Sequence, residues 1–295
     1  MEFYVGSSQS FDAALWKVRE DENRVYMAYP NPDHLGFDIP RGSDIGQLLE
    51  EKNPEFAIRK SRVEASRYFP RMTRPTIPYS TLSRGGYPGF EKEKFEIASS
   101  MIQMDALYSH FLEICRVVQP TEDNKDVFGH EIRNLFILAC TEFEAQCKGV
   151  LKANGANPKS KNANFNLTDY QSLVDAMQLD GYGVTLTAFP WWGEIEPLRT
   201  WKAKKTLEWY QNYNKVKHDR EEKFKLATLQ SAILAVSACA IMLDAQYLES
   251  AWGQFASPSL RRAFSFHRPT WDIADRYILP TVNDGVPMTP TPYPF

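Results

Sequence analysis

The sequence contains few of the residues from which metal and redox sites are built. Its 295 residues include four cysteines and five histidines, and no two cysteines form a CxxC pair. Structural zinc sites usually require closer ligand pairs, so we expect no metal site. All four cysteines lie in segments with helical periodicity. They are predicted to be small buried thiols in a reducing compartment.

Motifs of nucleotide-driven and hydrolytic enzymes are also missing. The chain has no GxGxxG, no GxxxxGK[ST] and no GxSxG sequence. His130-Glu131 is not followed by the second histidine of a zincin. We therefore expect no cofactor, and neither ATP-driven nor zinc-dependent chemistry.

Long hydrophobic runs are absent. The longest apolar stretch, Ala232 to Leu243, is interrupted only by Ser237. It is shorter than the about 20 residues that a membrane span requires. The first residues also lack a basic region followed by an apolar run, which a secretory signal would have. These features predict a buried core helix, no membrane association and a cytoplasmic location. A formal net charge of −3 argues against a uniformly basic nucleic-acid binder but permits local patches.

The first part of the chain differs from the middle in its proline content. Residues 1–90 contain eight prolines, which block long helices and central strands. We predict an irregular arm or small subdomain, with short strands and with short helices near residues 44–51 and 57–66. The last segment, 251–295, ends in several prolines and is predicted to be an extended or disordered tail.

Between these segments, residues 91–250 have helical periodicity. Apolar spacing predicts long helices over 91–118 and 126–154, a short helix ending near Gln178, and an extended piece over 181–188. A third long helix is expected from Pro197, bending near residues 218–220, and a fourth over 225–248. The predicted fold class is mainly α, a helical bundle of four to five helices flanked by the arm and the tail.

A histidine within the third helix stands among polar and cationic side chains. On a helix, Tyr210, Asn214, Lys217 and His218 share one face. A free imidazole titrates near pH ~6.5 and can act as acid or base. Lys217 and Arg220 are phosphate-type ligands. These groups could cleave RNA without a metal: a base activates the 2′-hydroxyl, a cation stabilises the phosphorus, and an acid protonates the leaving oxygen. The alternative is an exposed helix end that the charges merely solvate.

Charge and aromatic content around this histidine favour contact with nucleic acid. Residues 198–220 hold seven cations and two anions, interleaved with Trp201, Trp209, Tyr210 and Tyr213. Basic side chains among aromatics suit a surface that follows a phosphate backbone and stacks on bases. Lys215, Tyr213 and Tyr210 are therefore candidate RNA contacts. The aromatics could equally form the buried stripe of the helix.

The second long helix offers a possible second wall for the same site. Arg133 and Glu144 are eleven residues apart and share a helix face, and Lys148 follows one turn later. The competing interpretation is a structural ion pair with a neighbouring helix.

The helical bundle with a late Asn-x-x-x-His motif and a following apolar helix resembles the HEPN superfamily. In that family the signature is an Arg, then a polar residue such as Asn, then His. Asn214 and His218 match the last two positions, whereas Tyr213 occupies the position of the Arg. The resemblance covers roughly residues 91–250. It implies a four- or five-helix bundle, metal-independent ribonuclease activity of the toxin or antiviral-defence type, and a homodimer in which two motifs face each other.

Three possible functions follow from these observations. The first is a ribonuclease in which His218 is the acid and base, Asn214 orients it, and Lys217 and Arg220 hold the phosphate. The second is a non-catalytic helical module that binds RNA or other nucleic acid, a nucleotide, or a protein partner such as an antitoxin; Tyr213 in place of the Arg supports it. A structural or assembly protein is a third possibility.

Overall fold

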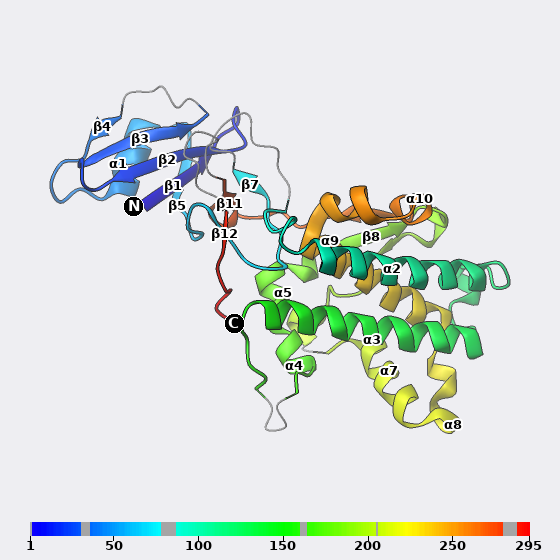
Figure 1. The fold of residues 1–295 in the computed structure, drawn as a ribbon. Coiled ribbons are helices and arrows are strands. Elements are labelled where there is room, and N and C mark those ends of the chain that lie inside the picture. The colour runs from blue at the N-terminus through cyan, green and yellow to red at the C-terminus, as the bar shows by residue number, and fades with distance from the viewer. Residues whose placement is uncertain (1, 31–35, 78–86, 160–163, 205, 280–287) are drawn as a thin grey trace. The chain divides into compact units, whose positions relative to one another are not determined.

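The structure is a computed structural model that describes residues 2–30, 36–77, 87–159, 164–204, 206–279 and 288–295, excluding the side chains of Arg220, Glu249 and Ser250. The chain forms two units (Figure 1). Unit 1 consists of Met1–Phe69, Arg74–Gly89 and Trp271–Thr291. Unit 2 consists of Pro70–Thr73, Phe90–Thr270 and Pro292–Phe295.

Unit 1 is built on a five-stranded antiparallel sheet with the order β4-β3-β2-β1-β5. Its strands are β1 (Glu2–Ser7), β2 (Ala14–Arg19), β3 (Arg24–Tyr29), β4 (Phe37–Asp38) and β5 (Ala57–Lys60). Prolines border these elements instead of interrupting them, because Pro30, Pro40 and Pro54 follow β3, β4 and α1. The strands are short, so proline can end each one without removing a central ladder bond.

Both faces of this sheet are covered. Successive side chains point to opposite faces of a strand. Trp16 packs on one face with Leu49 of α1 (Ile45–Lys52), whose N-terminus Asp44 caps by accepting from Gln47 N. Leu15 packs on the other face with apolar residues of the late chain, Ile273 and Ile278.

The C-terminal part of the chain completes unit 1. β11 (Tyr277–Ile278) pairs parallel with β7 (Thr76–Ile77), and β12 (Thr289–Pro290) pairs parallel with β6 (Arg67–Tyr68). Near η5 (Ile273–Asp275), Arg62 donates two hydrogen bonds to Asp275, at 2.8 and 2.7 Å. The buried Arg74 guanidinium lies over the rings of Phe69, Trp271 and Tyr277 and donates to the Asp275 carbonyl at 3.0 Å. Residues from both ends of the sequence thus share one core.

The prediction of a mainly α fold, a helical bundle with an irregular arm and an extended tail, is therefore wrong. The protein is mixed α/β, and unit 1 is a sheet with one short α-helix on one face. The helix expected near 44–51 is present as α1, but residues 57–60 form β5. The tail forms α10 (Pro258–Arg261), β10 (Phe264–His267), η5, β11 and β12. Its strand partners are distant in sequence, so local proline content could not reveal them.

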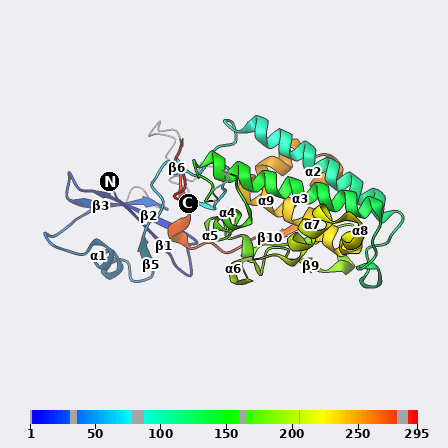
Figure 2. The ribbon, with the colours of Figure 1, turned by 90° about the horizontal axis from the view of Figure 1, so that it is seen from below.

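Unit 2 is organised around three long helices that lie side by side (Figure 2). They are α2 (Lys94–Cys115), α3 (His130–Ala153) and α9 (Leu229–Phe255). α9 packs on both other helices and is buried along most of its length, with a kink at Leu248 where φ is 53°. α7 (Glu208–His218) packs on α3 and α9 and leads into α8 (Arg220–Lys223) and η4 (Phe224–Leu226). All four of the predicted helical regions contain helix, with shifted ends.

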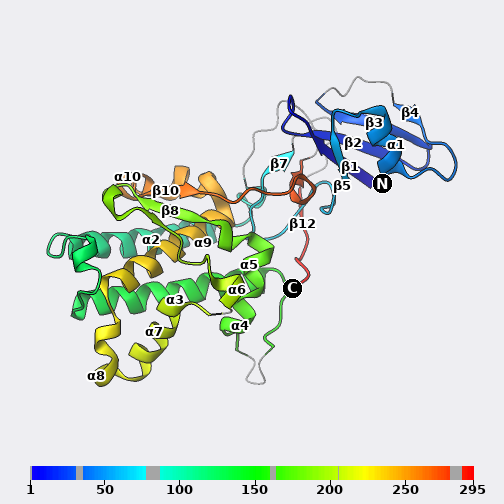
Figure 3. The ribbon, with the colours of Figure 1, turned by 180° about the vertical axis from the view of Figure 1, so that it is seen from behind.

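A small sheet accompanies these helices. Its order is β10-β8-β9, from β8 (Gly183–Leu186) and β9 (Glu194–Ile195) with β10. β8 lies within the predicted extended piece, and in Figure 3 β8 and β10 run beside α9 and α10. The short helices are α4 (Leu167–Tyr170), α5 (Ser172–Met177) and α6 (Trp201–Lys204), and the 3-10 turns are η1 (Glu122–Asn124), η2 (Leu179–Gly181) and η3 (Pro190–Trp192). The helix predicted to start at Pro197 is divided into α6 and α7.

One segment of α9 meets the length of a membrane span. Leu229–Leu248 comprises 20 residues of mean hydropathy 1.6. The sequence-based stretch ended at Leu243 because Asp244 follows it, yet Asp244 is itself buried and paired with Arg268. The window is 89% buried inside the structure, as expected for a core helix. The described helices therefore show no clear membrane-spanning pattern.

We expect Ile278→Ala to destabilise unit 1 by about 2–5 kcal/mol, because the Ile278 side chain is wholly buried beneath the sheet. Urea denaturation followed by circular dichroism measures this change. Ile102→Ala is the matched control, because Ile102 is 71% exposed and should change stability by less than about 0.5 kcal/mol. Equal effects of the two substitutions would contradict the role of the tail in the core.

Candidate functional site

The helix α7 has one buried side and one exposed side. Trp209, Tyr210, Tyr213 and Val216 are buried. The exposed residues include Lys217 and His218, together with Gln211 and Lys215, and Asn214 is half-buried. The buried positions recur three and four residues apart, which is the spacing of one helix face. The motif residues are therefore divided between the core and the surface.

α7 runs antiparallel to α3. The Trp209 ring lies 5.4 Å from that of Phe143, and the Tyr213 ring lies 6.3 Å from that of Phe136. Since the two helices run in opposite directions, the C-terminal turn of α7 lies near the N-terminus of α3. Consistent with this direction, the ring of His130, the first residue of α3, lies 5.0 Å from the ring of Phe224 in η4, which follows α7 and α8.

A polar seam runs between α3 and α7. The Tyr210 hydroxyl donates to Glu144 Oε1 at 2.6 Å, and Lys148 Nζ lies 3.6 Å from Glu144 Oε2. One turn along α7, Lys217 Nζ donates to the Tyr213 hydroxyl at 3.1 Å and lies 5.1 Å from the centre of its ring. We call Glu144, Lys148, Tyr210, Tyr213 and Lys217 the α3–α7 seam.

Burial and hydrogen bonding shift the pKa values of Tyr210 and Lys217 in the seam and of the neighbouring Tyr170. Burial, and then the hydrogen bond to Glu144, raise the pKa of Tyr210. Burial likewise raises the pKa of Tyr170, which feels the charge of the same carboxylate. The hydrogen bond with Tyr213 raises the pKa of Lys217. Tyr210 and Tyr170 therefore stay neutral at cellular pH, while Lys217 stays cationic.

The structure brings together much of the predicted site but changes the roles available to its aromatics. Tyr213 is 0% exposed and Tyr210 is bonded to Glu144, so neither ring is open for stacking on a base. Lys215, Lys217 and His218 lie on the surface, and Asn214 is on the same side. The side chain of Arg220 lies outside the described residues.

The predicted second wall is present in part beside α7. Glu144 and Lys148 belong to the seam and pair with each other, as the competing interpretation expected. Arg133 lies in the first turn of α3, at the end where α7 finishes. Its Nε atom is buried and has no hydrogen-bond partner within the described part of the chain. The sequence did not indicate Tyr170 of α4 as a neighbour of Glu144, because its position depends on the path of the chain between α3 and α4.

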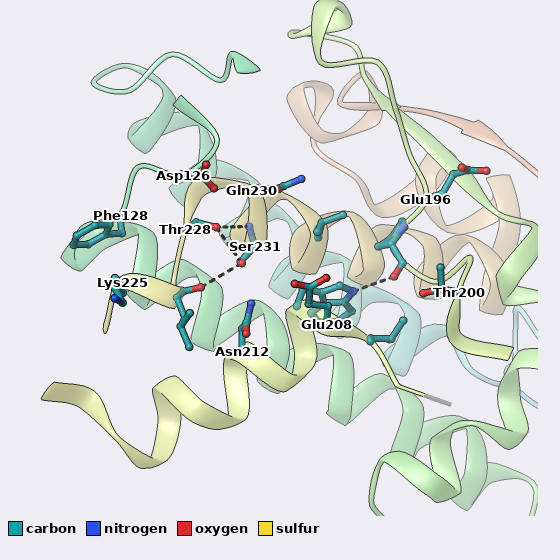
Figure 4. A pocket seen from close by; sticks show the side chains of 15 residues that line it. Asp126, Phe128, Glu196, Thr200, Glu208, Asn212, Lys225, Thr228, Gln230 and Ser231 are labelled. Carbon is teal, nitrogen blue, oxygen red and sulfur yellow. Dashed lines mark hydrogen bonds between the residues drawn. The ribbon is translucent and has the colours of Figure 1, made fainter. Parts of the chain in front are cut away.

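A cavity of about 600 Å³ lies on another side of α7, between its first half, η4 and the start of α9 (Figure 4). Three carboxylates line it, those of Asp126, Glu196 and Glu208, against one lysine, Lys225. Two of the lining residues are joined by a hydrogen bond, in which Trp209 Nε1 donates to the Pro197 carbonyl at 3.0 Å. This acidic lining disfavours the binding of an anion such as phosphate in the cavity.

No group of three or more His, Cys, Asp or Glu residues that could hold a metal ion occurs in the ranges that the structure describes. Among the four cysteines, burial raises the pKa of Cys140, Cys147 and Cys239 well above the ordinary value. A thiolate is therefore disfavoured at these positions.

Neither a protein-family model, nor a curated protein, nor a solved structure matches this chain. The resemblance to the HEPN superfamily depends on the sequence features given above and stays a prediction.

We expect Tyr210→Phe to lower the free energy of unfolding by about 1–3 kcal/mol at neutral pH, because Glu144 loses a donor in a largely buried site. The raised pKa of Tyr210 adds a pH signature. Its stabilising contribution is fully present below about pH 10, the ordinary tyrosine value, and is lost as the pH rises further. The difference between the two proteins should therefore shrink above about pH 10.

Tyr26→Phe is the matched control, because the Tyr26 hydroxyl donates to a glutamate on the surface, Glu22. Urea denaturation across pH measures both variants. A Tyr210→Phe effect as small as that of the control would show that the seam contributes nothing to stability.

Proposed function

We propose that unit 2 binds RNA through the phosphate backbone along the outer edge of the α3–α7 seam. The observation that supports this most directly is Lys217, an exposed lysine whose ammonium is held by the Tyr213 hydroxyl and ring. A cation held in one place loses less side-chain entropy on binding than a mobile one. Lys215 and His218 flank it on the same helix, and Lys148 lies across the seam.

The carboxylate within the seam does not cancel this charge. Glu144 is engaged by Tyr210 and Lys148, and its side chain is 17% exposed. Lys217 and Lys215 are left facing solvent with no carboxylate within ion-pair distance among the described residues. The edge therefore keeps a local positive charge although the chain as a whole is close to neutral.

Cleavage of the bound RNA is the second candidate function. It is favoured by the exposure of the His218 side chain, which no described residue engages in a hydrogen bond, on the side of α7 that carries Asn214. One imidazole can serve as base and, once protonated, as acid. A homodimer would supply a second His218. Against cleavage, the residue at the family's Arg position is the buried Tyr213, and Lys217 would have to stabilise the phosphorus. The cytoplasmic location predicted from the sequence stays part of this proposal.

Lys217→Gln should weaken binding of a fluorescein-labelled single-stranded RNA, measured by fluorescence anisotropy at several salt concentrations. Each phosphate contact to single strands contributes about 0.7 to the slope of log K against log salt. The slope should therefore fall in magnitude by about 0.7 in Lys217→Gln. Lys94→Gln, on the surface of α2, is the control and should leave the slope unchanged. Binding with the same slope in both variants would place the RNA elsewhere.

Incubation of the protein with RNA in EDTA tests cleavage. If His218 is the acid–base group, cleavage should proceed with EDTA present and fall by about 10²–10⁴-fold in His218→Ala. If the RNA stays intact but Lys217→Gln still weakens binding, the protein binds RNA without cleaving it. If cleavage persists in His218→Ala, the activity comes from other residues or from a contaminant, and His218 is not the acid–base group.

A further inference from the structure

A second candidate site lies at the far end of α9, away from the α3–α7 seam in sequence and in chemistry. A cavity of about 370 Å³ opens there between the last turns of α9, α10 and β10. Six residues line it: Trp252, Gly253, Arg261, Phe264, Phe266 and Arg268. Its described lining residues supply three aromatic rings and two guanidinium groups but no carboxylate, in contrast to the acidic cavity beside α7.

The aromatic wall is formed by two elements that hold each other in place. Phe264 and Phe266 are alternate residues of β10 and so point to the same face of the strand. The Trp252 ring lies 5.2 Å from Phe266 and 6.1 Å from Phe264. β10 is fixed in turn by its antiparallel pairing with β8. Trp252 and Phe264 are buried and Phe266 is half-buried, so a planar ligand would meet chiefly the Phe266 ring, which the other two hold in place.

The two arginines differ in how they are engaged. Arg268 donates to both carboxylate oxygens of the buried Asp244, at 2.8 and 2.9 Å, and its guanidinium lies 5.9 Å from the centre of the Phe266 ring. Its charge is compensated within the protein. Arg261 is exposed, and within the described chain its side chain makes only a long contact, 3.4 Å, with the Ala256 carbonyl. The net positive charge of the site is therefore on Arg261.

Gly253 lines the cavity without a side chain. A Cβ built on it would meet no heavy atom within 4 Å, so the space beside it is open.

We propose that this cavity binds a mononucleotide, with the base against Phe266, which Trp252 supports from behind, and the phosphate on Arg261. Base–aromatic stacking is worth 1–3 kcal/mol and tolerates any base. Arginine holds phosphate through paired donors. The volume lies near the lower end of the range for ligand pockets, which suits one nucleotide unit better than a dinucleotide. The site is independent of RNA binding at α7.

Isothermal titration calorimetry of the full chain with AMP, adenosine and ribose 5-phosphate tests the proposal. AMP should bind at least about tenfold more tightly than either fragment, because each fragment lacks one of the two contacts. Arg261→Gln should weaken AMP about tenfold and leave adenosine unchanged. Arg262→Gln, an exposed neighbour outside the cavity lining, is the matched control and should bind AMP as the unaltered protein does.

Gly253→Leu fills the cavity and should abolish AMP binding without loss of folding, which circular dichroism checks. The Lys217→Gln variant should bind AMP as the unaltered protein does. The RNA-binding proposal and the nucleotide proposal can therefore be rejected independently of each other. Absence of AMP binding, or AMP binding unchanged in both Arg261→Gln and Gly253→Leu, would overturn the proposal. Ribose 5-phosphate binding as tight as AMP would remove the role of the rings.

Discussion

The burial of α9 is the constraint on which unit 2 depends. A helix that is apolar on all sides must be covered on all sides. α2 and α3 cover two sides of α9, while α7 and β8 pack against it elsewhere. The polar groups that α9 does carry must then find partners inside, as Asp244 does with Arg268.

The requirement to cover α3 and α9 also explains how the motif helix is divided. α7 packs on α3 and α9, so its aromatic side turns inward and its lysines and His218 turn outward. Tyr213 and Tyr210 reach the core, but their hydroxyls need polar partners there. Lys217 and Glu144 supply them, which connects a buried packing layer to a charged surface. The same residues therefore have a structural role whether or not RNA binds there.

Periodicity predicted the parts of this protein whose structure is decided locally. The helix regions of residues 91–250 and the alternation of β8 were visible because amphipathic spacing follows directly from the elements. The short helix predicted over 57–66 is wrong where β5 forms, because four residues are too short for their alternation to indicate a strand. The partners of β6 and β7 were invisible because they lie some two hundred residues later in the chain. For the site, spacing brought Tyr210, Lys217 and His218 to one helix, but which of them faces inward depends on α3.

Unit 1 takes its strands from the first residues of the chain and the cover of one sheet face from Ile273 and Ile278. During synthesis the first five strands leave the ribosome long before this cover exists, so Val5 and Leu15 stay exposed to water in the meantime. Most of unit 2, Phe90–Thr270, emerges in between. One face of the sheet thus lacks its apolar cover until Ile273 and Ile278 have been made, and apolar surface exposed in this way is prone to aggregation.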